Sequence, residues 1–176
     1  MAEQRKYTRT TKSAVKSKPV DEYGHLQPQA IDFEEAVLGA LMIEKDAYSI
    51  VSEILRPESF YDHKHQLLYR AIMTLAMRQQ LIDILTVAEQ LRSTGDLEEA
   101  GGPFYITQLS GKVASSAHIE YHARIIAQKF LARELITFTS NIQTKAFDET
   151  QDVDDLMQEA EGKLFEISQK NMKKDY

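Results

Sequence analysis

Apolar residues recur at helical spacing in short stretches along the first two thirds of the chain. Asp32, Asp62 and Asp83 each precede such a stretch and are predicted N-caps. No window alternates apolar and polar residues with a period of two, so we expect an all-α fold. The pattern predicts a compact helical lobe over residues 27–115. We expect its helices at residues 33–43, 46–55, 63–75, 84–92 and 103–109.

The helical stretches become longer after Ser116. Residues 117–147 contain no Gly or Pro, and their apolar spacing predicts one helix of about 45 Å. Residues 148–151 form a short polar turn, and Asp152 is predicted to cap a second helix. A short loop between two helices makes them antiparallel neighbours. We therefore expect a long antiparallel helical hairpin over residues 116–170 that projects from the lobe.

The second helix of the hairpin carries a predicted seam of the coiled-coil type. Its apolar residues are spaced alternately by four and three positions: Val153, Met157, Ala160, Leu164 and Ile167. Together with other apolar side chains such as Phe147 and Phe165, they exceed what two helices can bury. We favour an interaction surface on the hairpin, and the alternative is that both helices fold back against the lobe. The predicted contact residues are Phe138, Ile142, Phe147, Val153, Met157 and Leu164.

Composition narrows the class of protein. The 176 residues include no Cys, which excludes disulfides, thiolate metal sites and Cys catalysis. No apolar run reaches the roughly 18 residues of a membrane span, so we expect no membrane contact. The N-terminus lacks the apolar stretch of a signal peptide. These features predict a soluble intracellular protein.

The charge is distributed unevenly along the chain. Residues 1–20 carry a net charge of +5, whereas the remaining residues carry −11. Because residues 1–26 are polar and have no periodicity, we expect a disordered basic arm. Such an arm can contact nucleic acid or an acidic protein surface. The simpler interpretation is a solvated tail that aids solubility.

The sequence contains no convincing catalytic motif. His118 and His122 share a helix face, but Glu120 does not stand beside the first His as the H-E-x-x-H motif requires. The Gly-Lys pairs at 111–112 and 162–163 lack the earlier Gly and the following Ser or Thr of a P-loop. We therefore expect no metal, no nucleotide cofactor and no enzymatic activity in this segment.

Several motifs nevertheless occur in a characteristic order. They are Gln27–Gly39 (QPQAIDFEEAVLG), Phe60–His65 (FYDHKH), Ile82–Asp83, Gly101–Tyr105 (GGPFY), Ser116–Tyr121 (SAHIEY) and Arg133–Ile136 (RELI). Over about residues 27–168 the chain resembles the N-terminal domain of bacterial replicative DNA helicases of the DnaB type. The resemblance implies a helical lobe followed by a hairpin, in agreement with the pattern above. One departure is His118, where relatives commonly carry Asn.

The resemblance also implies partners. In the complete helicase these domains would pair through their hairpins, and the pairs would build a collar on a hexamer. The collar would receive the C-terminal domain of primase, and a helicase loader is a further candidate partner. We expect residues 171–176 to begin a linker to a motor domain that is absent from this chain. ATP and Mg would belong to that motor domain, which unwinds DNA.

Two functions follow from the sequence. The first is a collar domain of a replicative helicase, working in the bacterial cytoplasm at the replication fork. It would contact DNA only through the full helicase, or weakly through the basic arm. The second is a stand-alone helical adaptor that contacts nucleic acid or replication proteins through residues 1–26.

Overall fold

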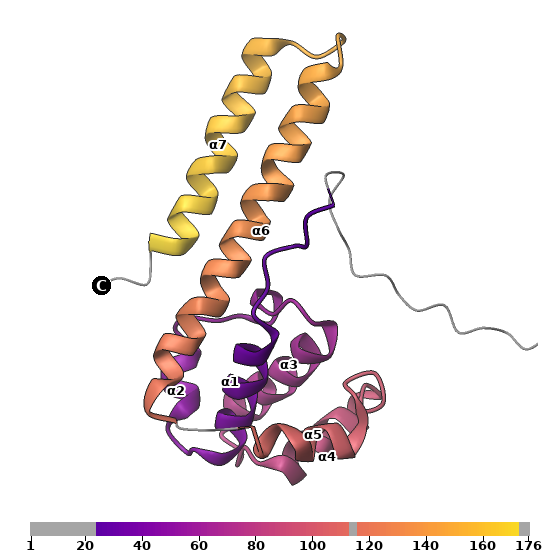
Figure 1. Ribbon diagram of the computed structural model, residues 1–176, viewed down its shortest axis with the longest axis vertical. Coiled ribbons are helices and arrows are strands. Elements are labelled where there is room, and N and C mark those ends of the chain that lie inside the picture. Colours follow the sequence, from indigo (N-terminus) through magenta and orange to yellow (C-terminus); the bar gives the residue numbers. More distant parts are fainter. Residues whose placement is uncertain (1–23, 113–115, 173–176) are drawn as a thin grey trace, which may run out of the picture.

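The fold is a helical lobe from which two long helices project (Figure 1). The computed structural model describes residues 24–112 and 116–172, and within them it contains helices and no strand, which confirms the all-α prediction. The lobe contains α1 (Ile31–Ile43), α2 (Ala47–Val51), the 3-10 helix η1 (Pro57–Ser59), α3 (His63–Met77), α4 (Ile84–Thr94) and α5 (Gly102–Ser110). The 3-10 helix η2 (Ser116–His118), α6 (Ile119–Phe147) and α7 (Val153–Met172) follow.

The core of the lobe is built around α1. This helix contacts α3, α5 and α6, and its side chains Val37, Leu38 and Leu41 are at most 1% exposed. Burying a side chain of this size stabilises a fold by roughly 1.5–3 kcal/mol. The aromatic ring of Tyr69 is also buried there, and its hydroxyl donates a hydrogen bond to the carbonyl of Leu55 (3.0 Å). The apolar spacing in the first stretch of sequence therefore reflects a central helix.

Two of the three N-caps predicted in the lobe are present. The Asp62 carboxylate accepts a hydrogen bond from the backbone N–H of Lys64 (2.9 Å). Asp83 accepts one from the N–H of Thr86 (2.8 Å), and the Thr86 hydroxyl in turn accepts one from the N–H of Asp83 (2.9 Å). This reciprocal pair is a capping box, which fixes the first turn of α4.

The predictions at α1 and α2 were wrong in detail. Asp32 is not a cap, because α1 begins at Ile31 and the N–H of Glu34 donates to the carbonyl of Ala30 (3.0 Å). Asp32 lies instead in the first turn, where its charge favours the helix dipole. The second helix covers only 47–51 rather than 46–55, since the next residues turn back onto the carbonyl of Val51 and enter the core.

Helix α6 belongs to both parts of the molecule. Its first turns contribute Ile119, Ala123 and Ile126 to the core of the lobe, where α6 packs on α1 and α2. The rest of the helix leaves the lobe, and α7 returns beside it in the opposite direction (Figure 1). The lobe core therefore includes residues beyond the expected division at 116, and α7 continues to Met172.

Candidate protein-binding surface

Few side chains hold the two helices of the hairpin together. Among the α7 residues whose burial the structure describes, only Leu156 and Ile167 are buried, and Ala160 is half-buried. An ion pair between Lys145 and Glu159 adds one polar link to α6. The predicted seam was therefore partly wrong: Ala160 and Ile167 are covered, but Val153, Met157 and Leu164 are exposed. Helix register explains this, because Leu156, Ala160 and Ile167 share one face of α7.

A shallow groove of about 410 Å³ runs along one side of the hairpin between α6 and α7. Met157 and Leu164 are 56% and 50% exposed along it, and Phe138 and Ile142 are half-buried opposite them. The structure thus brings together four of the six residues predicted to make contacts. The groove is lined by Phe138, Thr139, Ile142, Gln143, Met157, Ala160, Glu161 and Leu164.

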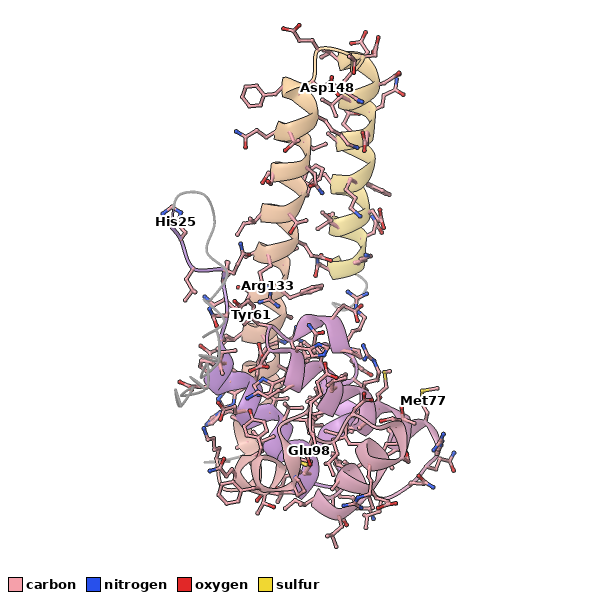
Figure 2. The ribbon with its side chains drawn as sticks, turned by 90° about the vertical axis from the view of Figure 1, so that its right-hand side faces the viewer. His25, Tyr61, Met77, Glu98, Arg133 and Asp148 are labelled. Carbon is pink, nitrogen blue, oxygen red and sulfur yellow. The ribbon has the colours of Figure 1, made fainter. Side chains whose placement is uncertain are left out.

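The other two predicted residues lie at the tip of the hairpin. Phe147 is 79% exposed and Val153 is 71% exposed, on either side of the turn that contains Asp148 (Figure 2). The Asp148 carboxylate accepts hydrogen bonds from the hydroxyl (2.7 Å) and the backbone N–H (3.0 Å) of Thr150. These bonds stabilise the carboxylate and lower the pKa of Asp148. Asp152 caps α7 by accepting from the N–H of Asp155 (3.0 Å), as predicted.

A second groove, of about 540 Å³, is also lined by Phe138 and Ile142 but has a different chemical character. It extends along α6 to Phe130 and Arg133, and its α7 wall includes Lys163. This larger groove is lined by charged as well as apolar side chains, whereas the exposed surface of the first groove is formed almost entirely by apolar atoms. The hairpin therefore offers two chemically distinct grooves.

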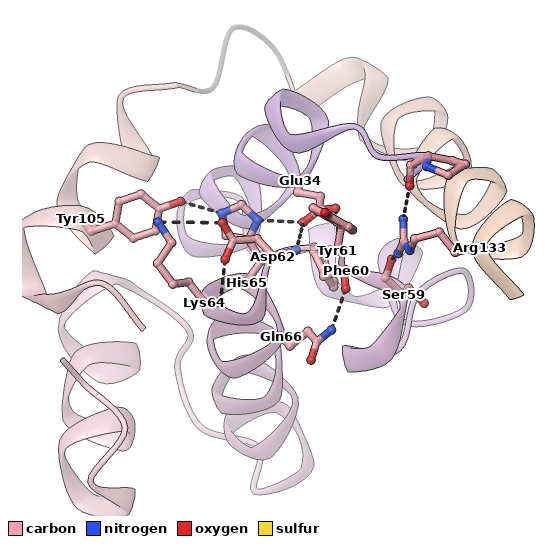
Figure 3. A network of polar contacts seen from close by, with 11 residues as sticks. Glu34, Ser59, Phe60, Tyr61, Asp62, Lys64, His65, Gln66, Tyr105 and Arg133 are labelled. Carbon is pink, nitrogen blue, oxygen red and sulfur yellow. Dashed lines mark hydrogen bonds and ion pairs between the residues drawn. The ribbon is translucent and has the colours of Figure 1, made fainter. Parts of the chain in front are cut away.

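Arg133 connects the hairpin to the lobe. Its guanidinium donates hydrogen bonds to the carbonyls of Pro28 (2.7 Å) and Ser59 (3.0 Å), as Figure 3 shows. The guanidinium also lies over the rings of Tyr61 (5.3 Å) and Phe130 (5.7 Å). Burial lowers the pKa of Arg133, against the opposing effects of Glu34 and Tyr61. No role for this residue was predicted from the sequence, although an Arg in line with Ile126 and Phe130 on an apolar helix face was a usable signal.

A buried polar network lies inside the lobe (Figure 3). His65 Nδ1 lies 2.8 Å from Glu34 Oε1, and His65 Nε2 lies 2.6 Å from the hydroxyl of Tyr105. Glu34 also accepts hydrogen bonds from the backbone N–H groups of Tyr61 (2.9 Å) and Asp62 (3.3 Å). The network joins α1, α3 and α5, and it was not predicted from the sequence.

The hydrogen bonds of Glu34, His65 and Tyr105 are all satisfied by the following arrangement of donors and acceptors. A carboxylate at Glu34 accepts from a proton on His65 Nδ1, and His65 Nε2 then accepts from the hydroxyl of Tyr105. Desolvation is the main cause that raises the pKa of Tyr105, so its hydroxyl keeps the donated proton. Because Glu34 and His65 are fully buried, the network links three helices in the interior of the lobe.

The two histidine pairs that the sequence singled out are packed differently. The rings of His118 and His122 lie 6.4 Å apart, and His122 packs edge-on against Phe33. His63 contacts Glu99 (2.8 Å) at the surface, whereas His65 points into the buried network. Within residues 24–112 and 116–172, no three His, Asp or Glu side chains converge as a metal site would require. No helix in the same ranges combines the length and apolarity needed to cross a bilayer.

Comparison with known proteins identifies the family. Residues 26–128 match the family model of the DnaB-like helicase N-terminal domain. The chain is 44% identical over 151 residues to the replicative DNA helicase DnaB of Rhodothermus marinus, which covers 86% of this chain and 16% of that protein. It is 38% identical over 145 residues to the replicative DNA helicase DnaC of Bacillus subtilis, covering 82% and 32%.

Solved structures support the same family assignment. The N-terminal domain of DnaB helicase from Mycobacterium tuberculosis matches with a TM-score of 0.75 and 34% identity, over 79% of this chain and 98% of that one. A DnaB-like replicative helicase, studied together with its interactions with primase, matches with a TM-score of 0.65 and 28% identity. That match covers 78% of this chain and 31% of the helicase.

The chain belongs to the DnaB-like helicase N-terminal domain family. This domain is the non-catalytic N-terminal part of a replicative DNA helicase, which agrees with the resemblance found in the sequence. The chain spans a third or less of the length of the full-length helicases described above. The family model ends within α6, at residue 128, whereas the 151-residue match to the Rhodothermus marinus helicase extends beyond that point into the hairpin.

The network predicts the effect of removing one hydroxyl. Tyr105→Phe should leave His65 Nε2 as a buried acceptor without a donor, which costs about 1–3 kcal/mol. The free energy of unfolding, measured by urea denaturation at pH 7, should fall by that amount. Tyr121→Phe is the matched control, because Tyr121 is exposed and its hydroxyl should contribute little. Equal stability of the two variants would show that the hydrogen bond to His65 adds nothing.

The hydrogen bonds in the turn at the hairpin tip predict that the pKa of Asp148 depends on the hydroxyl of Thr150. Thr150→Val removes the hydroxyl that donates to Asp148, so the pKa of Asp148 should rise toward its usual value. The rise should be incomplete, because the backbone N–H of residue 150 still donates. In the native turn the lowered pKa stabilises the fold above the unfolded pKa, and this contribution disappears as the pH falls through the folded pKa. NMR titration of the Asp148 carboxyl measures the shift, and an unchanged pKa would contradict the assignment.

Proposed function

We propose that this chain is the assembly and docking domain of a replicative DNA helicase and that the outer hairpin is its contact surface. The observation that carries the proposal is the exposed apolar groove containing Met157 and Leu164 on a hairpin that buries few of its own side chains. Exposed apolar surface of this kind is typical of protein interaction sites. The proposed contact residues remain Phe138, Ile142, Phe147, Val153, Met157 and Leu164.

A second copy of the hairpin is a suitable partner. The residues of α6 carry a net charge of +2, and those of α7 carry −3. A pairing that places α7 of one copy against α6 of the other would bring opposite charges together and cover both grooves. Complementary charge of this kind favours orientation and specificity more than raw affinity. We propose that such pairs build the collar of a hexamer.

Primase is the second proposed partner. One of the matched helicases is known through a structure that concerns its interactions with primase, and its likeness to this chain supports a similar docking role. A helicase loader is a further candidate. ATP hydrolysis with Mg and DNA unwinding would belong to a motor domain elsewhere in the helicase, with cytoplasmic action at the replication fork.

The proposed organisation of the chain keeps the boundaries expected from the sequence. Residues 1–26 would be a basic arm, 27–115 the lobe, 116–170 the hairpin, and 171–176 the start of a linker to the motor. Residues 1–23 and 173–176 lie outside the part that the structure describes. The family match favours this organisation over the stand-alone adaptor, since it accounts for the lobe without requiring the arm to carry the function.

Charge placed in the groove tests the proposal. Met157→Glu and Leu164→Glu should each weaken self-association by at least tenfold, because a carboxylate would have to be desolvated on the partner's apolar surface. Capture of a primase C-terminal domain should be measured in parallel. Sedimentation velocity gives the association, and circular dichroism checks that helicity is intact.

Gln158→Glu provides the matched control. This residue is exposed on α7, lines neither groove, and gains the same charge. We expect it to associate like the unmodified chain. If both groove variants keep native association and native primase binding, the hairpin groove is not the interface.

A further inference from the structure

The contacts of α6 with the lobe are concentrated in the N-terminal half of the helix. The apolar anchors Ile119, Ala123 and Ile126 lie within its first eight residues, and all three are buried. Beyond them, Arg133 is the most C-terminal residue of α6 for which the structure shows a side-chain hydrogen bond to the lobe. The remainder of α6 contacts α7, which has its main contacts with α6 in return. The direction of the hairpin therefore depends on a short stretch of helix.

Arg133 is well placed to fix that direction. Its two hydrogen bonds reach different segments of the lobe: Pro28 precedes α1, and Ser59 ends η1. The planar guanidinium presents its donors in a rigid fork, so both bonds are satisfied in only a narrow range of helix orientations. The rings of Tyr61 and Phe130 near the guanidinium restrict it further. Among the described ion pairs none involves Arg133, so backbone carbonyls are its hydrogen-bond acceptors here.

The geometry amplifies any loss of this restraint. From Ile126 to Phe147 the helix rises by about 31 Å, at roughly 1.5 Å per residue. A tilt of about 10° around the buried anchors would move the tip by about 5 Å over that length. Because α7 packs on α6, the grooves would move with it.

We propose that Arg133 is a positioning residue that sets the angle at which the hairpin leaves the lobe. The fork holds α6 against the segment before α1 and against η1, and the buried anchors act as the pivot. The angle is a property of the single chain. Its consequence for assembly, which is that paired hairpins place their lobes at a defined spacing, rests on the function proposed above.

Distances between lobe and hairpin tip test this proposal. The chain contains no native Cys, so introduced cysteines are the only labelling sites. Spin labels at Lys45→Cys and Glu149→Cys give one distance, and labels at Gln80→Cys and Glu149→Cys give a second from another point on the lobe. All three positions are exposed. Dilution with excess unlabelled protein restricts double electron–electron resonance to distances within one chain.

We expect narrow distance distributions with Arg133 present. Arg133→Met should shift or broaden at least one distribution by about 5 Å, while circular dichroism still shows a helical protein. Arg133→Lys should have a similar effect, because a single ammonium does not span two carbonyls as the fork does. It also serves as the second variant if Arg133→Met fails to fold. Arg124→Met is the matched control, since Arg124 is exposed on the same helix and its ion pair with Glu120 lies within α6.

Unchanged distributions in the folded Arg133 variants would overturn the proposal, even if their thermal stability fell. Equal broadening in Arg124→Met would overturn it too, because the effect would then not be specific to the fork. Failure of the hairpin to self-associate leaves these intrachain distances unaffected. The positioning role and the proposed assembly role are therefore tested separately.

Discussion

The packing of the first turns of α6 on α1 is the interaction on which the rest of the structure depends. It closes the core of the lobe through Ile119, Ala123 and Ile126. It also anchors the helix that carries the entire hairpin. One stretch of helix therefore provides part of the core of one unit and the base of the other. A defect there would affect the stability of the lobe and the placement of the hairpin together.

The order of helices was partly predictable because three of the α-helices begin at a side-chain cap. Asp62, Asp83 and Asp152 bond to backbone N–H groups in the next turn, and these bonds depend on residues close in sequence. The start of α1 was misjudged, since Asp32 is also an acceptable first-turn residue. The end of α2 was misjudged because burial of the following residues overrides helical spacing.

The candidate surface was predictable in composition but not in arrangement. Apolar spacing on α7 indicated too many apolar residues for a two-helix seam, and the structure leaves Met157 and Leu164 exposed. The apolar spacing did not show that Leu156 would pack against α6 in their place, because the rotation of α7 about its own axis depends on the turn that precedes it. The bonds of Arg133 to Pro28 and Ser59 join residues 105 and 74 positions apart. Contacts at such separations leave only a faint pattern in a single sequence.

Hydrogen exchange along α7 is the most direct measurement of the central claim, which is that the hairpin is an assembly surface. The unmodified chain is compared at low and high concentration by mass spectrometry, with peptides from α4 and α5 as an internal reference. If hairpins pair, amides of α7 and of the outer half of α6 should exchange more slowly at high concentration, while the lobe peptides stay unchanged. Association that protects the lobe and leaves α7 unchanged would contradict the account.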